Sequence, residues 1–550
     1  MIAFLLLFLM PHASAMAAQP PIPSDATITA ILKQRLLGQP KSGIILGIID
    51  DGTVRVVKIG SSGMARPLDT RTLFEIGSVT KTMTATTLAE MVLAKTVTLN
   101  EPISNILPAT VRVPSKDGKQ ITLLNLATQH SGLPRMPSNI VARDPENPYA
   151  DYTKADLFQF LDSYTLTRDP GASFEYSNLG FGLLGTVLAI KAHLSYDALI
   201  ESRIFAPLHM TQSSVTLPPA LRPLFAVGHD SSGGSVEPWT LRTLAGAGAV
   251  HSNMHDMLNY LRCNMGLGPL ARACLFAQQP RSTFPGHRIG LAWWTDNGTD
   301  IIQHGGDTAG YHAMIAMTAD RTRGIVILSN GPEVDGNLGL HILNTAIPLS
   351  PQARYVNLSS TELSAYVGTY RTTIPGANLM IAKRGNHLTA QLTGQDPLPL
   401  TASAPDHFYN NDVAGAIQFI RQHGTIVGLG LLQAGRELDA VKLGPSGEPL
   451  VQAVTIPHPP IVTLSPETLQ SYVGTYTLNG QPYITVKQDK YGIELRVVGQ
   501  ASVPVYAMAK DHFYYKVVDA SVTFTRNPVG TVIGLTLDQN GVDYQAVKAP

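Results

Sequence analysis

The chain has little charge and almost no cysteine. Only 15% of its 550 residues are charged, and 40 Lys and Arg balance 40 Asp and Glu. No long run of one sign occurs, which disfavours nucleic acid or an anionic membrane surface as a partner. The two cysteines, Cys263 and Cys274 in "LRCNMGLGPLARAC", have no metal-ligating neighbours, which disfavours a zinc site. In an oxidising compartment they could form a local disulfide; a pair of buried thiols is the alternative.

Long apolar runs are also lacking beyond the N-terminus. The start, "MIAFLLLFLMPHASAMAAQP", has an apolar run from Ile2 to Met10 followed by small-x-small sites. This pattern predicts a signal peptide over residues 1–17, atypical because no Lys or Arg precedes the run. The run is too short to span a bilayer. We therefore expect a secreted or periplasmic protein with no integral membrane segment in the mature chain.

Several well-known motifs are missing. The chain has no phosphate-binding loop, no dinucleotide fingerprint and no G-x-S-x-G elbow, so nucleotide chemistry and the α/β-hydrolase route are unsupported. His251 and His255 stand four residues apart in a segment that we expect to be helical, as metal ligands can. No Glu follows the first histidine and no third ligand is visible, so we interpret both as structural. We expect no metal and no other cofactor.

The length requires more than one domain. Residues 25–350 mix amphipathic helices with strand-like runs, and strands at both ends predict one layered α+β domain. "SGIILGIIDDGTVRVVKIG" predicts a hairpin that turns at Asp51-Gly52. "HAMIAMTADRTRGIVILSN" predicts two adjacent strands near the end of this domain.

An internal repeat follows. "ELSAYVGTY" ending at Tyr370 recurs as "TLQSYVGTY" ending at Tyr476, and "GTIVGLGL" from Gly424 recurs as "GTVIGLTL" from Gly530, each 106 residues later. Both copies alternate apolar and polar residues and contain frequent turn residues. The repeat therefore predicts two small antiparallel β-barrels, over residues 357–452 and 463–550, joined by a Pro-rich linker.

"FEIGSVTKTM" places a serine and a lysine one helical turn apart. Ser78 opens an apolar-periodic segment, so it can be an N-cap that accepts backbone N–H groups. Alternatively, Ser78 is a nucleophile that Lys81 deprotonates, because side chains at i and i+3 share one helix face. This segment alone leaves both interpretations open.

Two further short motifs are weak when each is taken alone. Tyr176-Ser177-Asn178 in "PGASFEYSNLGFGLLG" could be a tyrosine packed at a turn with an Asn cap. His304-Gly305-Gly306 in "DIIQHGGDTAGYHAMIAM" could be glycines in a hairpin.

Taken together and in this order, with "ATQHSGLPR" between the first two, these motifs are specific. Over residues 25–350 the chain resembles the serine β-lactamase and penicillin-binding protein superfamily, in its class C β-lactamase-related branch. The family's elements are Ser-x-x-Lys, Tyr-x-Asn and Lys/His-x-Gly, which correspond here to 78–81, 176–178 and 304–306. The resemblance implies a β-lactamase/transpeptidase-like fold, an antiparallel sheet flanked by helices.

The resemblance also implies the chemistry. Ser78 would attack a carbonyl and form an acyl-enzyme, Lys81 would accept or shuttle its proton, and Tyr176 would relay a proton to the leaving group. A phenol titrates near pH 10, so an adjacent ammonium would be needed to lower that value. The remaining roles implied are substrate binding by Asn178 (which could instead orient Lys81), His304, Gly305 and Gly306, and an oxyanion hole formed by the backbone N–H groups of Ser78 and Asp307.

Two departures from the family bear on the substrate. Class C β-lactamases carry a lysine where this chain has His304, which is cationic only below about pH 6.5 unless its environment shifts it. Met136 falls near the position of their amide-binding glutamine. Both differences weaken the case for a dedicated β-lactamase, because His-x-Gly is familiar from D-aminopeptidases, D-Ala-D-Ala peptidase-like proteins and esterases of this branch.

The two predicted barrels resemble the lipocalin-like barrels of bacterial D-aminopeptidases. The resemblance implies a gating role near the active site; stability or surface attachment is the alternative. We therefore expect an exported serine hydrolase that cleaves amide bonds in β-lactams or in short peptides containing D-amino acids. A carboxylesterase and a penicillin- or wall-peptide-binding protein with little turnover are the alternative functions.

Overall fold

The structure is a computed structural model of this 550-residue chain. The signal peptide expected over residues 1–17 lies outside its described residues. The structure describes residues 20–36, 39, 41–144, 146–230, 233–284, 286–331, 337–347, 349, 356, 358–374, 376–385, 387–393, 397–410, 415–433, 436–455, 459–478, 481–489, 492–497, 503–516, 520–539 and 542–549.

The first domain is built on one antiparallel sheet in the order β2-β1-β14-β13-β12-β11-β10-β9. The N-terminal hairpin thus pairs with the last strand of the domain, which closes the sheet late in the chain. The strands are β1 (Gly43–Asp50), β2 (Thr53–Gly60), β9 (Ser282–Phe284), β10 (His287–Ile289), β11 (Trp294–Asp296), β12 (Ile302–Asp307), β13 (His312–Met317) and β14 (Arg323–Ser329).

Helices cover both faces of this sheet. Their bounds are α1 (Asp25–Arg35), α2 (Thr80–Leu93), α3 (Leu123–Ala127), α4 (Lys154–Ser163), α5 (Asn178–Ala192), α6 (Tyr196–Ile200), α7 (Met254–Asn264), α8 (Ala271–Gln278) and α9 (Leu338–Leu343). Short 3₁₀ or π turns are η1 (Gly77–Val79), η2 (Ile103–Asn105), η3 (Glu201–Phe205), η4 (Pro219–Leu224) and η5 (Arg242–Ala247). Three two-stranded pairs complete the domain: β3 (Leu73–Glu75) with β8 (His251–Asn253), β4 (Ser115–Lys116) with β5 (Lys119–Gln120), and β6 (Gly228–His229) with β7 (Ser235–Val236).

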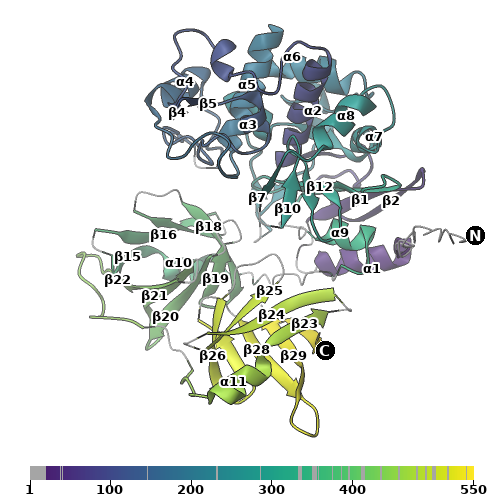
Figure 1. The fold of residues 1–550 in the computed structure, drawn as a ribbon. Coiled ribbons are helices and arrows are strands. Elements are labelled where there is room, and N and C mark those ends of the chain that lie inside the picture. The colour runs from purple at the N-terminus through teal and green to yellow at the C-terminus, as the bar shows by residue number, and fades with distance from the viewer. Residues whose placement is uncertain are drawn as a thin grey trace, which may run out of the picture.

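The alternation of side chains along β1 divides the interior into two cores. Ile45 and Ile49 belong to the large core under α2, α5, α7 and α8, whereas Ile44, Leu46 and Ile48 pack with α1 and α9. Successive side chains of a strand point to opposite faces, which explains why every residue from 43 to 49 is buried. Figure 1 shows the larger helical layer on one side of the sheet and α1 and α9 on the other.

The two hairpins expected in this domain are confirmed. Strands β1 and β2 pair from end to end around Asp51 and Gly52, which both have positive φ, as a tight two-residue hairpin turn requires. Strands β13 and β14 also pair along their length. The α+β fold expected from the sequence is therefore correct.

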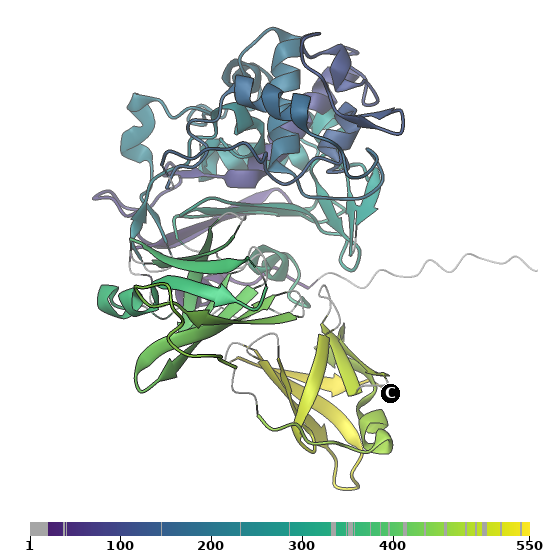
Figure 2. The same ribbon diagram turned by 90° about the vertical axis from the view of Figure 1, so that its left-hand side faces the viewer.

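Two closed eight-stranded antiparallel barrels follow, as the repeat predicts. Both lie on the α1 and α9 side of the sheet in the two views (Figures 1 and 2). The first barrel has α10 (Ser360–Tyr366), β15 (Gly368–Thr372), β16 (Asn378–Arg384), β17 (His387–Leu392), β18 (Leu398–Ala404), β19 (His407–Asn410), β20 (Gly415–Gln422), β21 (Thr425–Gln433) and β22 (Arg436–Lys442). The second has α11 (Pro466–Tyr472), β23 (Gly474–Leu478), β24 (Gln481–Asp489), β25 (Gly492–Val497), β26 (Val503–Ala509), β27 (His512–Tyr515), β28 (Ala520–Arg526), β29 (Val532–Gln539) and β30 (Val542–Lys548).

The repeated "YVGTY" motif has the same structural role in both barrels. The Tyr370 hydroxyl donates to the carbonyl of Tyr366 at 2.6 Å, and the Tyr476 hydroxyl donates to that of Tyr472 at 2.6 Å. All four tyrosines are buried. The motif therefore joins each short helix to the first strand of its barrel. On this basis we propose the domain division 25–350, 357–452 and 463–550.

The first barrel contacts the first domain. His387 Nδ1, at the start of β17, lies 3.5 Å from an Asp230 carboxylate oxygen in the β6–β7 hairpin. Within the described ranges no single helix combines the length and apolarity needed to cross a membrane. One pair, Asn178–Ala192 with Tyr196–Phe205, meets that test jointly across a bend of 79°.

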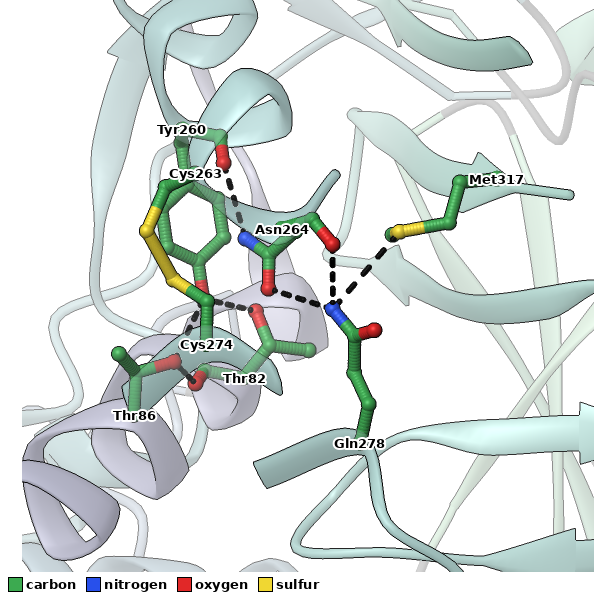
Figure 3. Close-up of a disulfide and its surroundings, with 8 residues drawn as sticks. All are labelled: Thr82, Thr86, Tyr260, Cys263, Asn264, Cys274, Gln278 and Met317. Carbon is green, nitrogen blue, oxygen red and sulfur yellow. Dashed lines mark hydrogen bonds between the residues drawn. A yellow bond between two sulfur atoms is a disulfide. The ribbon is translucent and has the colours of Figure 1, made fainter. Parts of the chain in front are cut away.

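A disulfide joins Cys263 in α7 to Cys274 in α8. Of the two possibilities left open by the sequence, a local disulfide is confirmed and a pair of free buried thiols is wrong. Figure 3 shows it beside Tyr260, whose hydroxyl lies 3.0 Å from Thr82 Oγ1 and 3.3 Å from Thr86 Oγ1 on α2. The crosslink therefore stabilises the helices that support α2.

Removing the disulfide should destabilise this domain. Closing a loop with a sequence separation of 11 contributes about 3 kcal/mol by the chain-entropy relation. Denaturant unfolding of the oxidised protein with and without reductant measures this difference. The Cys263→Ser, Cys274→Ser variant is the matched control, and we expect reductant not to change its midpoint. Equal midpoints for the oxidised and reduced wild type would contradict a stabilising disulfide.

Candidate active site

Ser78 lies where strand β3 ends and helix α2 has not yet begun. It is the central residue of η1, and the N-cap position of α2 is Val79, with no side-chain cap. The interpretation of Ser78 as an N-cap is therefore wrong. Gly77 has a φ of 47°, a left-handed conformation that glycine adopts without strain. Ser78 lies before the N-cap of α2, so the Ser78 hydroxyl is available for Lys81.

Lys81 projects from the first turn of α2 into a buried site. Its Nζ lies 2.8 Å from Ser78 Oγ, 2.8 Å from Asn178 Oδ1 and 2.7 Å from the carbonyl oxygen of Ala247. A neutral amine satisfies this set fully: two N–H groups donate to the two carbonyl-type oxygens, and the lone pair accepts the Ser78 O–H. Three parts of the chain, far apart in sequence, meet at this one nitrogen.

The environment of Lys81 favours its neutral form. The side chain is 0% exposed. Burial lowers the pKa of Lys81 well below its ordinary value, and the nearby Arg135 guanidinium lowers it further. Among the described residues, the hydrogen-bond partners of Lys81 Nζ are a hydroxyl, an amide oxygen and a main-chain carbonyl, and none is a carboxylate. A neutral amine beside a hydroxyl is a general base.

Tyr176 and Asn178 are placed by the start of α5. Ser177 caps this helix: its Oγ accepts from Gly180 N–H at 2.8 Å and donates to the Pro134 carbonyl at 2.6 Å. Lys81 Nζ lies 5.0 Å from the centre of the Tyr176 ring. Burial raises the pKa of Tyr176 to about 12, although the Ser78 hydroxyl and Arg135 act in the opposite direction. Tyr176 is therefore a neutral phenol at pH 7.

An adjacent ammonium would be needed to lower the pKa of Tyr176, and in the free protein burial raises that pKa instead. Burial dominates over the neighbouring charges, and Lys81 is itself poorly able to hold a proton. These protonation states suit a lysine that accepts a proton and a phenol that donates one.

Strand β12 approaches the nucleophile closely because two glycines face each other. A Cβ on Gly77 would lie 2.7 Å from Asp307 N, and a Cβ on Gly306 would overlap Ile76 O and lie 2.7 Å from Ser78 N. Thr308 N–H donates to Tyr311 O at 3.0 Å. Because ladder bonds alternate, Asp307 N–H points away from β13. The amides of Ser78 and Asp307 therefore lie at one place, as an oxyanion hole requires.

His304 is buried under β12, on the same face as Gly306. Its Nδ1 lies 2.6 Å from the Gly305 carbonyl, so Nδ1 carries the hydrogen, and its Nε2 is buried without a hydrogen-bond partner among the described residues. Burial lowers the pKa of His304 to about 3. His304 is therefore neutral at pH 7 and offers an acceptor, whereas a substrate carboxylate needs a cation.

A cleft opens beside Ser78, with about 340 Å³ of space when the solvent at its mouth is included. Its walls are mostly apolar and include the Trp239 ring, which meets Tyr149 edge to face at 5.1 Å. The lining residues are Gly77, Ser78, Met136, Tyr149, Asn178, Trp239, Leu241, Leu244, Ala247, Gly248, Asp307 and Thr308. The cleft suits a compact apolar group next to the reacting carbonyl.

Several groups at this site were not singled out from the sequence. The Arg135 guanidinium carbon lies 5.3 Å from the centre of the Tyr176 ring, and Trp239 forms one wall. Arg135 immediately follows "HSGLP", so that motif could have pointed to it. The Ala247 carbonyl and Trp239 lie outside every recognised motif, and no sequence signal identifies them.

The two histidines considered as metal ligands do not share a helix. His251 lies on strand β8 and His255 on α7, so their expected i, i+4 helical spacing is wrong. Within the part of the chain that the structure describes, no group of three or more His, Cys, Asp or Glu residues could hold a metal ion.

Comparison with known proteins agrees with this geometry. The family model described as Beta-lactamase matches residues 28–344. The chain is 30% identical over 386 residues to the D-alanyl-D-alanine-carboxypeptidase/endopeptidase AmpH of Escherichia coli K12, covering 64% of this chain and 92% of that protein. It is 25% identical over 345 residues to a β-lactamase of Pseudomonas fluorescens, covering 56% and 92%.

The fold also has counterparts among solved structures. The β-lactamase/D-alanine carboxypeptidase from Yersinia pestis matches with a TM-score of 0.51 and 23% identity, over 58% of this chain and 98% of that one. The D-alanine carboxypeptidase AmpC from Burkholderia cenocepacia matches with a TM-score of 0.50 and 24% identity, over 58% and 97%.

Gly306→Ala should separate β12 from the nucleophile. The new Cβ meets the Ile76 and Ser78 backbone, so we expect the rate of Ser78 acylation by a fluorescent penicillin to fall roughly a hundredfold or more, as when an oxyanion donor is lost. Gly305→Ala is the matched variant, because the nearest atom to its Cβ is Ala313 O at 4.0 Å. We expect its loss to stay below about tenfold. Equal losses in both variants would contradict this role of Gly306.

Neutral His304 predicts a specific pH behaviour. The ratio of kcat/KM for a carboxylate-bearing substrate to that for a neutral ester should stay constant from pH 5 to 8, because the pKa of His304 is lowered to about 3 and its charge does not change in that range. Initial rates with both substrates in the same buffers measure this ratio. A fall in the ratio centred near pH 6.5 would instead identify His304 as the cation that binds the carboxylate.

Proposed function

The chain belongs to the Beta-lactamase family, a family of serine hydrolases, and from that premise we propose that it forms an acyl-enzyme on Ser78. In this proposal it hydrolyses amide bonds of β-lactams or of short peptides that contain D-amino acids. The observation that carries the proposal is the contact of Lys81 Nζ with Ser78 Oγ at 2.8 Å inside a buried, apolar site.

Acylation would begin with proton transfer from Ser78 to Lys81. The lone pair of the neutral amine takes the hydroxyl proton while the Ser78 oxygen attacks the carbonyl carbon. Asn178 Oδ1 and the Ala247 carbonyl, at 2.8 Å and 2.7 Å, hold the amine in place and stabilise the ammonium that forms. The negative charge that develops on the substrate oxygen faces the amides of Ser78 and Asp307.

Collapse of the tetrahedral intermediate needs a proton on the leaving nitrogen. Tyr176, a phenol at pH 7, would donate it and recover a proton from the Lys81 ammonium, which lies 5.0 Å from its ring centre. Water then repeats these steps on the ester and releases the product with Ser78 restored. Each residue thus returns to its starting protonation state.

Substrate preference would follow from the walls of the cleft. These walls favour a compact apolar acyl group, and the nearby His304, whose Nε2 is buried, is neutral at pH 7. The similar proteins named carboxypeptidase/endopeptidase and β-lactamase support amide hydrolysis at a D-amino acid or a β-lactam ring. Asn178, Gly305 and Gly306 would contact the substrate.

We propose export to the periplasm or outside the cell on the basis of the N-terminal apolar run. The substrate is a small molecule or short peptide, and the mechanism uses no metal or other cofactor. A gating role for the first barrel stays a prediction, and its contact with the first domain is that of His387 with Asp230.

Ser78→Ala tests the nucleophile. We would mix the protein with a chromogenic cephalosporin and follow absorbance and intact mass together. Wild type should gain the mass of the opened ring, either transiently with rapid colour change or persistently, and Ser78→Ala should gain none. Tyr176→Phe should lower the acylation rate about a hundredfold or more, as loss of a general acid does. Tyr164→Phe, which keeps its stack on Phe160, is the matched control.

The outcomes separate the alternative functions. Turnover without lasting adduct indicates a β-lactamase, and a lasting adduct indicates a peptidase or binding protein that β-lactams trap. Fast hydrolysis of short esters, with neither turnover of the cephalosporin nor a lasting adduct, would favour the carboxylesterase. An adduct that also forms on Ser78→Ala would contradict the proposal.

A further inference from the structure

One buried carboxyl near Ser78 has no part in the proposed mechanism. Glu75 is the last residue of β3, three residues before the nucleophile, and is 3% exposed. Its Oε1 accepts a hydrogen bond of 2.8 Å from the backbone N–H of Trp239, one of the cleft walls. Glu75 therefore connects the strand that leads to Ser78 with that wall.

Glu75 also lies close to Thr308, which follows the end of β12. Glu75 Oε2 and Thr308 Oγ1 are both buried, and neither forms a hydrogen bond of ordinary geometry within the described residues. The Thr308 hydroxyl can donate to the ionised carboxyl, which lowers the pKa of Glu75 against the larger effect of burial. Thr308 lines the cleft and directly follows Asp307, whose amide belongs to the expected oxyanion hole. A protonated Oε2 can donate to the Thr308 oxygen while Oε1 still accepts from Trp239.

The groups that face Glu75 offer it no counter-charge. His251 Nε2, on β8, lies 3.9 Å from Oε1, but burial lowers the pKa of His251 to about 4, so it is neutral at pH 7. Burial raises the pKa of Tyr311, on the β12–β13 connection, well above its ordinary value. Glu237 is exposed and carries the same sign. No Lys or Arg forms an ion pair with Glu75 in the described part of the chain. Burial accordingly raises the pKa of Glu75 to about 7.

We propose that Glu75 is a positioning residue of this active site: its protonated carboxyl ties the Trp239 wall and Thr308 to the segment that carries Ser78. When Glu75 ionises, an unpaired negative charge lies behind the oxyanion hole. That charge opposes the negative charge that develops on the substrate oxygen. This inference rests on the proposed function, because it concerns the reaction at Ser78.

Glu75→Gln tests the proposal, because glutamine has the shape of the protonated carboxyl and does not ionise. The readout is the rate of Ser78 labelling by a fluorophosphonate, which needs no knowledge of the substrate, from pH 5.5 to 8.5. The ratio of wild-type to variant rate should be near one at pH 5.5. It should fall roughly tenfold by pH 8.5, short of the loss of a whole oxyanion donor. Glu237→Gln, an exposed carboxyl nearby, is the matched control, with a constant ratio.

Thermal unfolding gives an independent readout. A glutamate ionises near its ordinary pKa of 4.5 when unfolded but near about 7 when folded. The free energy of unfolding of the wild type is therefore unaffected by this group below pH 4.5. It decreases as the pH rises from 4.5 to about 7, and the loss is complete above that. The Tm of Glu75→Gln should exceed that of the wild type increasingly over this range.

The results distinguish the possible failures. If wild-type Ser78 is labelled but the ratio of the wild-type rate to the Glu75→Gln rate does not change with pH, the positioning role is wrong. No labelling of wild-type Ser78 at any pH means that the proposed function fails, and with it this role. A Tm difference that is constant with pH overturns the titration of Glu75 inside the fold.

Discussion

The site depends on one buried amine. Lys81 Nζ contacts Ser78 Oγ, Asn178 Oδ1 and the Ala247 carbonyl within 2.8 Å, so the start of α2, the start of α5 and the end of η5 must all be in place at once. Taking an amine out of water disfavours its charged form, and no carboxylate pairs with it among the described residues. Burial without a counter-charge thus favours the neutral amine that the proposed mechanism uses as its general base. The disulfide and the large core under the sheet support this arrangement by holding α2.

The second constraint is the close approach of β12 to the nucleophile. Gly77 and Gly306 each leave room for the backbone of the other segment, and a side chain at either position would meet main-chain atoms. Main-chain atoms cannot move aside as a flexible side chain can. The position of the two oxyanion amides is therefore a property of the backbone. The buried Glu75 lies at this junction, because it ends β3 and accepts a hydrogen bond from the Trp239 N–H. In our proposal its protonation state therefore affects the two amides.

Much of this could be predicted from the sequence. The order of the Ser-x-x-Lys, Tyr-x-Asn and His-x-Gly motifs identified the family and the residues that meet, and the 106-residue offset identified two barrels. The charge states could not be predicted. His304 and Tyr176 titrate according to how deeply the fold buries them, which no motif records. The roles of the Ala247 carbonyl and of Trp239 could not be predicted either, because no sequence motif marks a backbone carbonyl or a single aromatic residue.

The most direct test of the account is the protonation state of Lys81. We would label the lysine ε-carbons with ¹³C and follow their chemical shifts with pH, with Lys81→Met identifying the signal. We expect the Lys81 signal to titrate well below those of the other lysines, whose ordinary pKa is about 10.4. A signal that stays protonated to pH 10 with the other lysines would contradict the account, because Lys81 could not then take the proton from Ser78.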